Sequence, residues 1–425
     1  MELKKKVPEL RFRGFSGEWE EKVFSETFTP IPNNSLSRAE LNYNSGLAKS
    51  IHYGDVLINY GELLDISRDE VPFVTDDSIA KKYFPFKLQN GDVVIADAAE
   101  DETVGKCVEL MNIKDEIVIS GLHTISVRPV RLFSSMYLGY FMNSSSYHNQ
   151  LLRLMQGTKV LSISKSTIKD TEILFPEHAT EQSRIGTWFQ HLDQLITLHQ
   201  KKYNKLTNIK KAMLEKMFPK NGADVPEIRF EGFEGKWEEK KLGEISPLRG
   251  GFAFQSNQYC EEGIPIIKIS NILATGEIGG EFDHYKEQEK DENYTLPNYS
   301  ALLAMSGATT GKVSILKKEN NIKVYQNQRV GYFVNKGIVD YLFISTILRS
   351  NLFAKKLSSV LVAGAQPNVS SKEIDSFEFS IPISIAEQQK IGTYFQKLDH
   401  LITLQQTQID KLKNIKKACL EKMFV

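Results

Sequence analysis

Two polar clusters in the second half of the chain have the residue types that read nucleic acid bases. One is Gln326–Arg329 (QNQR), and the other runs from Ser306 to Lys312 (SGATTGK). Asn and Gln can pair bidentately with adenine, Arg and Lys with guanine, and Ser or Thr with phosphates or base edges. Two Ser/Thr-rich loops, 157–165 and 364–372, offer similar chemistry. The alternative for any single residue is a turn whose polar side chain satisfies its own backbone.

Residue patterns for catalysis are much weaker. Gly307 to Lys312 superficially suggests a phosphate-binding loop, but only three residues separate its glycines and Val313 replaces the required Ser or Thr. The sequence contains no GxGxxG after a strand, no HExxH, no GxSxG and no metal-spaced Cys/His set. The acidic run 97–102 could bind a cation, but a solvated loop explains it better. We therefore expect neither a metal site nor an active site.

The elements that must position these clusters are those of mixed α/β domains. Short β-branched runs bounded by Gly, Asn and Pro predict strands. The runs are 92–95, 117–119, 124–127, 264–269, 301–305 and 330–334. Amphipathic stretches predict one helix over 136–154 and another over 341–357.

Two segments of the chain occur twice, whereas the blocks between them do not resemble each other. The tag 7–22 returns at 225–240 with 12 of 16 positions identical, and 181–218 returns at 387–424 with 26 of 38 identical. A period of about 200 residues is too long for a solenoid. The repeats therefore indicate two domain-sized units, each followed by the same long element.

The longer repeat has the heptad pattern of a coiled coil sustained for about five heptads. Its predicted helix-pairing residues are Ile185, Leu192, His199 and Leu206 in the first copy, and Ile391, Leu398, Gln405 and Leu412 in the second. A polar residue in mid-seam, here His199 or Gln405, often fixes register and orientation. The helix lysines are read mainly as a solvated face, with contact to a partner or to DNA phosphates as the alternative.

Connectivity predicts how these parts are joined. The linker 219–224 is short, so the second block must follow closely on the end of the first helix, and the second helix must run back along it. A helix of about 36 residues would be a rod about 54 Å long. The predicted fold class is α+β, with two globular mixed α/β domains separated by two long antiparallel coiled-coil helices in a pseudo-two-fold repeat. The expected boundaries are 1–177 and 219–383 for the domains, and 178–218 and 384–425 for the helices.

Composition indicates an ordinary globular chain of two domains. The 425 residues are 41% hydrophobic, and 53 Lys and Arg balance 53 Asp and Glu, which argues against nonspecific coating of nucleic acid. No signal-peptide pattern or apolar run of about 18 residues is present, and three scattered cysteines suit a reducing compartment. We expect a cytoplasmic protein that does not enter a membrane.

Several segments together resemble the specificity subunit of type I restriction-modification systems, over nearly the whole chain. The segments are the paired VPE-RF-GF-G-W tags, LLAMSGATTGKVSIL at 302–316, the NQ pair at 327–328, AQPNVSSKEI at 365–374 and IPISIAEQQKIGTYF at 381–395. The first block departs from this pattern, because 95–106 (IADAAEDETVGK) stands where the second block has its SGATTGK run.

The resemblance implies two target recognition domains, each reading one half of a bipartite site in double-stranded DNA, and helices that set the spacer between the halves. It further implies docking of two adenine methyltransferase subunits, with restriction (translocase) subunits in the full complex. S-adenosylmethionine, ATP and Mg are then expected on those partner subunits and no cofactor on this chain. The DNA contacts expected from loop chemistry are Lys159, Ser162, Lys165, Thr309, Lys312, Gln328, Arg329, Gln366 and Asn368.

On this reading the chain is a noncatalytic subunit that recognises DNA for a methyltransferase and endonuclease complex. The first alternative is a protein-interaction scaffold with a coiled-coil spacer. The second is a stand-alone nuclease, against which the missing metal-binding and nucleotide-binding motifs argue.

Overall fold

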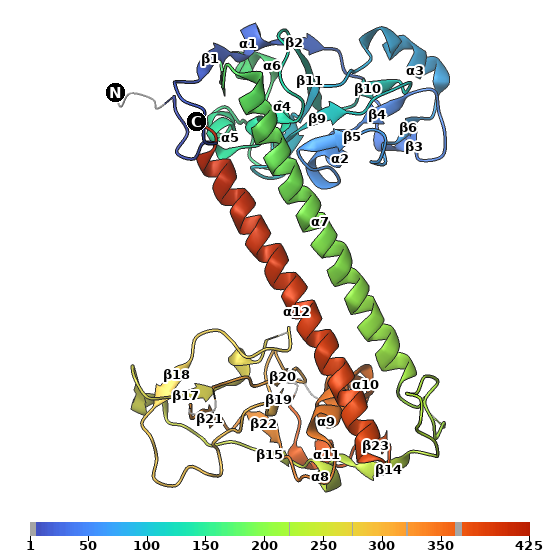
Figure 1. Cartoon of the computed structure of the whole chain (residues 1–425), viewed down its shortest axis with the longest axis vertical. Coiled ribbons are helices and arrows are strands. Elements are labelled where there is room, and N and C mark those ends of the chain that lie inside the picture. Colours follow the sequence, from blue (N-terminus) through green and yellow to red (C-terminus); the bar gives the residue numbers. More distant parts are fainter. Residues whose placement is uncertain (1–5, 221, 274, 320–321, 362–367) are drawn as a thin grey trace. The chain divides into compact units, whose positions relative to one another are not determined.

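The computed structural model of the chain describes residues 6–220, 222–273, 275–319, 322–361 and 368–425. It divides into two compact units, the first formed by Met1–Gln200 with Thr407–Val425 and the second by Lys201–Gln406. Both long helices, α7 (Ala179–Lys216) and α12 (Ile385–Lys422), therefore contribute one half to each unit (Figure 1).

The first unit contains a five-stranded sheet and a four-stranded sheet. The larger sheet has the order β2-β11-β7-β9-β5, with β2 at Phe28–Ile31, β11 at Thr124–Pro129, β7 at Val93–Ala96, β9 at Cys107–Met111 and β5 at Leu63–Asp65. The smaller has the order β10-β4-β6-β3, with β10 at Val118–Ser120, β4 at Lys49–Ile51, β6 at Phe73–Val74 and β3 at Leu41–Asn42. Two-stranded ladders join β1 (Glu20–Val23) to β13 (Glu172–Phe175) and β8 (Ala98–Ala99) to β12 (Leu161–Ser162).

The second unit repeats the order of the other strands of both sheets, but the described residues contain no counterpart of β5. One sheet has the order β15-β22-β19-β20, with β15 at Leu248–Arg249, β22 at Val330–Phe333, β19 at Ala301–Ala304 and β20 at Val313–Ile315. The other has the order β16-β18-β17-β21, with β16 at Tyr259–Cys260, β18 at Asp283–Tyr285, β17 at Ile264–Ile267 and β21 at Tyr325–Gln326. The ladder of β14 (Glu238–Lys241) with β23 (Glu378–Ile381) matches that of β1 with β13.

The register of the central strands also agrees between the units. Thr124 opposes Ala96 in the first unit as Val330 opposes Ala304 in the second. The β10–β4 and β21–β17 pairs are parallel in both. All the strands predicted from the sequence are confirmed, and blocks that share little sequence share one fold.

Each of the two predicted amphipathic helices is in fact a pair of short helices. The helical structure predicted over 136–154 is confirmed but is interrupted, because α4 (Tyr137–Met142) ends before α5 (Ser145–Leu152). Over 341–357 the structure likewise has α9 (Tyr341–Leu348) and α10 (Asn351–Leu361). A serine causes each break, since Ser144 Oγ donates to Phe141 O and Ser350 Oγ donates to Ile347 O, both at 2.6 Å. Such side-chain bonds to the backbone compete with helix continuation.

Short helices complete the two domains. They are α1 (Phe24–Thr27), α2 (Tyr53–Ile58), α3 (Asp77–Tyr83) and α6 (Lys165–Ile168) in the first unit, and α8 (Leu242–Ile245) and α11 (Ser371–Asp375) in the second. No helix in the described ranges combines the length and apolar character that crossing a bilayer requires.

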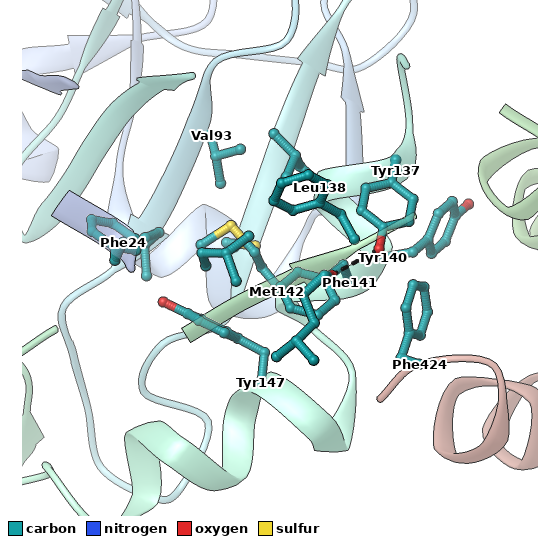
Figure 2. Packing of buried hydrophobic residues seen from close by; sticks show 14 of the residues in the cluster. Phe24, Val93, Tyr137, Leu138, Tyr140, Phe141, Met142, Tyr147 and Phe424 are labelled. Carbon is teal, nitrogen blue, oxygen red and sulfur yellow. Dashed lines mark hydrogen bonds between the residues drawn. The ribbon is translucent and has the colours of Figure 1, made fainter. Parts of the chain in front are cut away.

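The hydrophobic core of each unit includes both long helices. In the first unit α4 is wholly buried, and Tyr137 and Phe141 pack against Phe424, just beyond α12 (Figure 2). Phe424 also stacks on Phe189 near the start of α7, with ring centroids 5.6 Å apart. In the second unit Phe218, just beyond α7, packs on Phe395 near the start of α12. The start of one helix thus meets the end of the other, so the paired halves are antiparallel.

The predicted seam residues lie in or beside these cores. Ile185, Leu192, Ile391 and Leu398 are buried within them, whereas Leu206 and Leu412 are partly buried against them. The mid-seam residues His199 and Gln405 are half-buried.

Each repeated tag joins the two long helices in its unit. Arg11 donates from Nε and Nη2 to the buried Glu181 carboxylate at 2.7 and 2.8 Å, in the first turns of α7. Leu10 N donates to Lys422 O, the last residue of α12, at 2.9 Å. Attachment of the tag to both long helices is consistent with its being repeated together with them.

The second tag repeats these contacts. Arg229 holds Glu387 at 2.7 and 2.8 Å, and Ile228 N donates to Lys216 O at 2.9 Å. The repeat of tag and helix together fits these contacts, because Arg11 and Arg229 have the same partner residue on the repeated helix.

Candidate nucleic-acid interface

Three loop segments meet in a row at one end of the central strands of the first unit. Asp97 follows β7, His123 precedes β11 and Ile163 follows β12. Asp97 N donates to His123 O at 3.1 Å, and Ile163 N donates to Asp97 O at 2.9 Å. We call the residues of these segments, with the adjoining Ser162, the first loop row.

The second unit contains the same row. Met305 N donates to Arg329 O at 3.0 Å, and Val369 N donates to Met305 O at 3.0 Å. Asn368 adjoins Val369 and forms an antiparallel bridge to Ser306. These residues form the second loop row, in which Met305, Arg329 and Asn368 take the places of Asp97, His123 and Ser162.

The loop after Asp97 and the loop after Met305 each lead back to the sheet through a glycine whose backbone φ lies in the left-handed region. Gly105, with φ of +89°, donates from N to Ala96 O, and Gly311, with φ of +88°, donates to Ala304 O. A Cβ at Gly105 would lie 2.4 Å from Leu151 Cδ1, and one at Gly311 would lie 2.6 Å from Leu357 Cδ2. Gly311 and Lys312, which superficially resembled part of a phosphate-binding loop, therefore belong to the turn that leads the chain back into the sheet.

The residues expected to contact DNA in the first unit are all exposed. Lys159 and Ser162 lie on the connection that leads into the row, and Lys165 begins α6. Ser162 is fixed through its backbone, whose N–H donates to Gln156 O at 2.8 Å.

The expected contacts in the second unit divide into two groups. Gln328, Arg329 and Asn368 are exposed in or beside the second row. Thr309 is half-buried with its hydroxyl donated to Ile269 O at 3.1 Å, and Lys312 is half-buried after the glycine return. Gln366 lies outside the described residues.

Within the QNQR cluster, Gln326 is buried and has a structural role, whereas Arg329 is exposed and can contact a ligand. Gln326 is fully buried, and its amide donates to Arg249 O and Val330 O at 2.8 and 2.7 Å. Recognition by Gln326, one reading of the cluster, is therefore excluded. In contrast, no acceptor in the described part of the chain engages the exposed Arg329 guanidinium, which leaves its donors for a ligand.

His123 and Asp97 are row residues that sequence reasoning did not propose as DNA contacts, although it weighed the acidic run that begins at Asp97 as a cation site. His123 Nδ1 lies 3.2 Å from Asp97 Oδ1, the His123 side chain is 52% exposed, and the Tyr53 ring packs edge-on against the imidazole. Burial raises the pKa of the Asp97 carboxyl, which His123 and Lys165 partly offset. The sequence offers no clear signal for this equivalence, because the offset between the two copies is 218 residues at the tags, 208 from Asp97 to Met305 and 206 at the helices.

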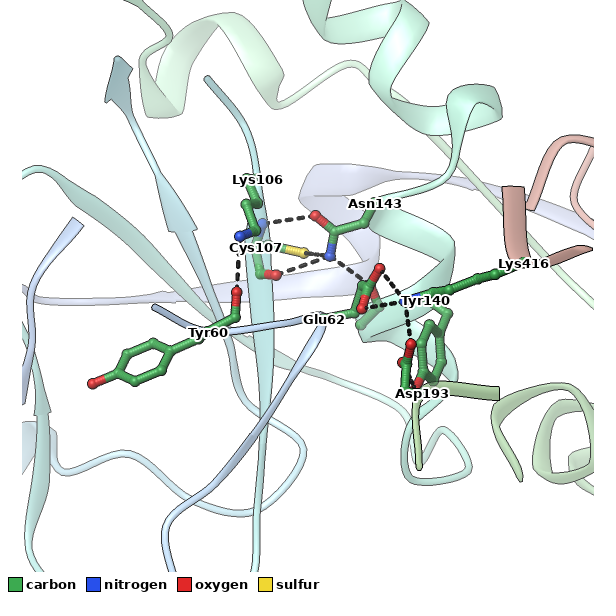
Figure 3. A network of polar contacts seen from close by, with 9 residues as sticks. Tyr60, Glu62, Lys106, Cys107, Tyr140, Asn143, Asp193 and Lys416 are labelled. Carbon is green, nitrogen blue, oxygen red and sulfur yellow. Dashed lines mark hydrogen bonds and ion pairs between the residues drawn. The ribbon is translucent and has the colours of Figure 1, made fainter. Parts of the chain in front are cut away.

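A polar network attaches the first loop row to the long helices (Figure 3). Lys106 lies at the end of the loop that follows Asp97. Its ammonium group donates to Leu57 O at 2.9 Å and to Tyr60 O at 2.8 Å, and burial lowers the pKa of Lys106. Asn143 holds the next residue, Cys107, by accepting from its N–H at 3.0 Å and donating to its carbonyl at 2.8 Å.

Glu62, two residues after Tyr60, continues this network to both helices. Lys416 of α12 contacts the Glu62 carboxylate at 2.7 Å and Asp193 of α7 at 2.6 Å, and the Tyr140 hydroxyl donates to Asp193 at 2.7 Å. Burial lowers the pKa of Lys416, but the two carboxylates outweigh burial and raise it overall. The row is thus anchored to the helix pair rather than carried on a free loop.

The second unit has a shorter version of this anchor. Asp399 of α12 accepts from Lys210 of α7 at 2.6 Å and from Arg349 at 2.5 Å. Arg349 follows α9 as Asn143 follows α4. In the described ranges, no group of three or more His, Cys, Asp or Glu side chains could hold a metal ion.

Comparison with known proteins places this arrangement in a family. The model of the type I restriction modification DNA specificity domain matches residues 57–208 and 234–414. The chain belongs to this family. The two matched segments carry the two loop rows, and the resemblance inferred from sequence motifs is confirmed.

Two curated relatives are specificity subunits from Methanocaldococcus jannaschii. The chain is 25% identical over 280 residues to the type I restriction enzyme MjaVIII specificity subunit, covering 62% of this chain and 64% of that protein, which is under two thirds of its length. It is 22% identical over 362 residues to the putative type I restriction enzyme MjaX specificity subunit, covering 82% and 80%.

A solved structure has the same fold. The type I restriction-modification system S subunit from M. genitalium aligns over 99% of both chains with a TM-score of 0.61 and 14% identity. The predicted fold class, two mixed α/β recognition domains with a pair of long antiparallel helices, is confirmed.

Proposed function

We propose that this chain is the DNA-reading subunit of a type I restriction-modification complex, in which each unit recognises one half of a bipartite site. One observation carries the proposal: two loop rows with the same backbone bonds present different side chains. Sequence is read by side chains that reach base edges, whereas a shared backbone fixes where they stand. Two such readers suit two different half-sites.

The subunit acts on DNA by binding and leaves catalysis to its partners. Two adenine methyltransferase subunits dock on it, and restriction subunits join the full complex. S-adenosylmethionine, ATP and Mg belong to those subunits in this scheme. Exposed leucines at matching positions of both helices support two equivalent docking surfaces: Leu195 and Leu198 on α7, and Leu401 and Leu404 on α12. Each is separated from its counterpart by the 206-residue offset of the repeat.

The length of the helices sets the spacer between the half-sites in this proposal. Each long helix has 38 residues, which corresponds to about 57 Å at about 1.5 Å per residue. One added heptad lengthens a helix by about 10 Å, or about three base pairs of DNA. The proposal therefore links a change in helix length to a countable change in the recognised site.

The test inserts one heptad after Gln200 in α7 and one after Gln406 in α12, where the two units divide each helix. Base-resolution mapping of adenine methylation, in cells that supply the methyltransferase, should show both half-sites unchanged and the spacer about three base pairs longer. A heptad in α7 alone is the matched control, and it should abolish methylation because the paired halves no longer match in length. An unchanged spacer in the double insertion would refute the role of the helices.

A further inference from the structure

We infer that equivalent positions of the two loop rows determine the base preference of the two half-sites, and that His123, which contacts Asp97, is the counterpart of Arg329. The inference rests on the proposed function and names the residues that carry out the reading. The positions are Asp97, His123 and Ser162 in the first row and Met305, Arg329 and Asn368 in the second.

The backbone makes these positions equivalent. In each row the middle residue donates its N–H to the carbonyl of the residue before the central strand, at 3.1 Å for Asp97 and 3.0 Å for Met305. The middle carbonyl then accepts from Ile163 at 2.9 Å or from Val369 at 3.0 Å. Because both bonds use only the main chain, the side chains of the row are free to differ.

The side chains of the second row are rich in donors. The Arg329 guanidinium is exposed and has no acceptor in the described ranges, and Asn368 is exposed on the other side of Met305 in the row. A guanidinium suits the two major-groove acceptors of guanine, and a carboxamide suits adenine. The half-site read by the second unit should therefore favour guanine opposite Arg329 and adenine opposite Asn368.

The first row presents a different set. Asp97 supplies an acceptor where the second row has the apolar Met305, and its carboxylate lies 3.2 Å from the His123 imidazole. The Tyr53 ring, with its centroid 5.2 Å from that of His123, helps to hold the imidazole in place. A carboxylate accepts from the amino group of cytosine, which the second row cannot do through Met305. The two rows are therefore expected to prefer different bases.

The experiment exchanges the chemistry of the rows within the full complex. One variant, Met305→Asp with Arg329→His, gives the second row the character of the first, and the reciprocal variant is Asp97→Met with His123→Arg. Adenine methylation is mapped at base resolution for each and for the wild type. Each variant should change or relax one or two adjacent positions of its own half-site by about tenfold or more. The other half-site serves as the internal control.

Single substitutions guard against misfolding. If the second-row exchange fails to accumulate as folded protein, Arg329→Gln keeps a long polar side chain and should relax the same half-site positions. Unchanged base preference at the altered half-site, or methylation weakened equally at all sequences, would overturn the inference and leave these residues with phosphate or folding roles. Absence of any bipartite motif in the wild-type map would instead overturn the proposed function.

Discussion

The Arg229–Glu387 pair predicts how strongly the repeated tag holds the second unit together. The Glu387 side chain is 1% exposed and that of Arg229 is 16% exposed, and two charge-assisted bonds of 2.7 and 2.8 Å join them. Arg229→Met would leave this carboxylate buried without its partner. Removing one member of a buried pair costs about 3–5 kcal/mol, and partial access of water near Arg229 favours the lower end, about 3 kcal/mol.

That free energy converts to a measurable shift in melting temperature. For a unit of about 200 residues, 1 kcal/mol shifts Tm by about 2–4 °C, so Arg229→Met should lower the transition of the second unit by about 6–12 °C. Differential scanning calorimetry measures the shift, and hydrogen exchange should rise over the tag 225–240. The first unit's transition should stay in place.

Two controls test the electrostatic reasoning. Arg229→Met combined with Glu387→Gln removes the buried charge and should recover most of the lost stability. Arg11→Met breaks the equivalent pair with Glu181 and should move only the first unit's transition. A shift below about 2 °C for Arg229→Met, or no recovery in the double variant, would refute the account of a buried charge that needs its partner.

Two further predictions concern the strands behind the loop rows. Gly311→Ala should destabilise the second unit by about 1–2 kcal/mol because φ at this position is positive. The loss should be larger still because the new Cβ would clash with Leu357. A variant with unchanged thermal unfolding would contradict this prediction. Burial raises the pKa of Glu109 to about 7, against opposing bonds from Gly139 and Met136. A raised carboxyl pKa stabilises the first unit at pH below about 4.5, and this stability is lost as pH rises toward 7, by about 3 kcal/mol in total. Glu109→Gln should remove that component of the pH slope in urea unfolding, and parallel slopes for both proteins would count against it.

The structure explains which parts of the candidate site could be predicted from the sequence. The sequence could mark Arg329 and Asn368 as candidates because polar side chains in loops can reach bases, and the structure leaves both residues exposed. Gln326 has the same chemistry but is buried and bonded to the backbone, a difference that residue type cannot reveal. His123 was missed because its importance follows from its place in the row.

The sequence by itself determined the frame of this protein. The heptad pattern predicted the long helices, because apolar spacing along a helix directly dictates its buried face. The repeated tags predicted two related units, and β-branched runs located the central strands. These features are local, so a single chain segment is enough to encode each of them.

Only the tertiary structure showed that the two blocks, which differ in sequence, have the same fold. Equivalence of Asp97 with Met305, and of His123 with Arg329, arises from main-chain bonds between segments far apart in the chain. Such bonds place no requirement on side-chain identity, so they leave almost no trace in the sequence. For the same physical reason, one backbone can hold two different sets of side chains for recognition.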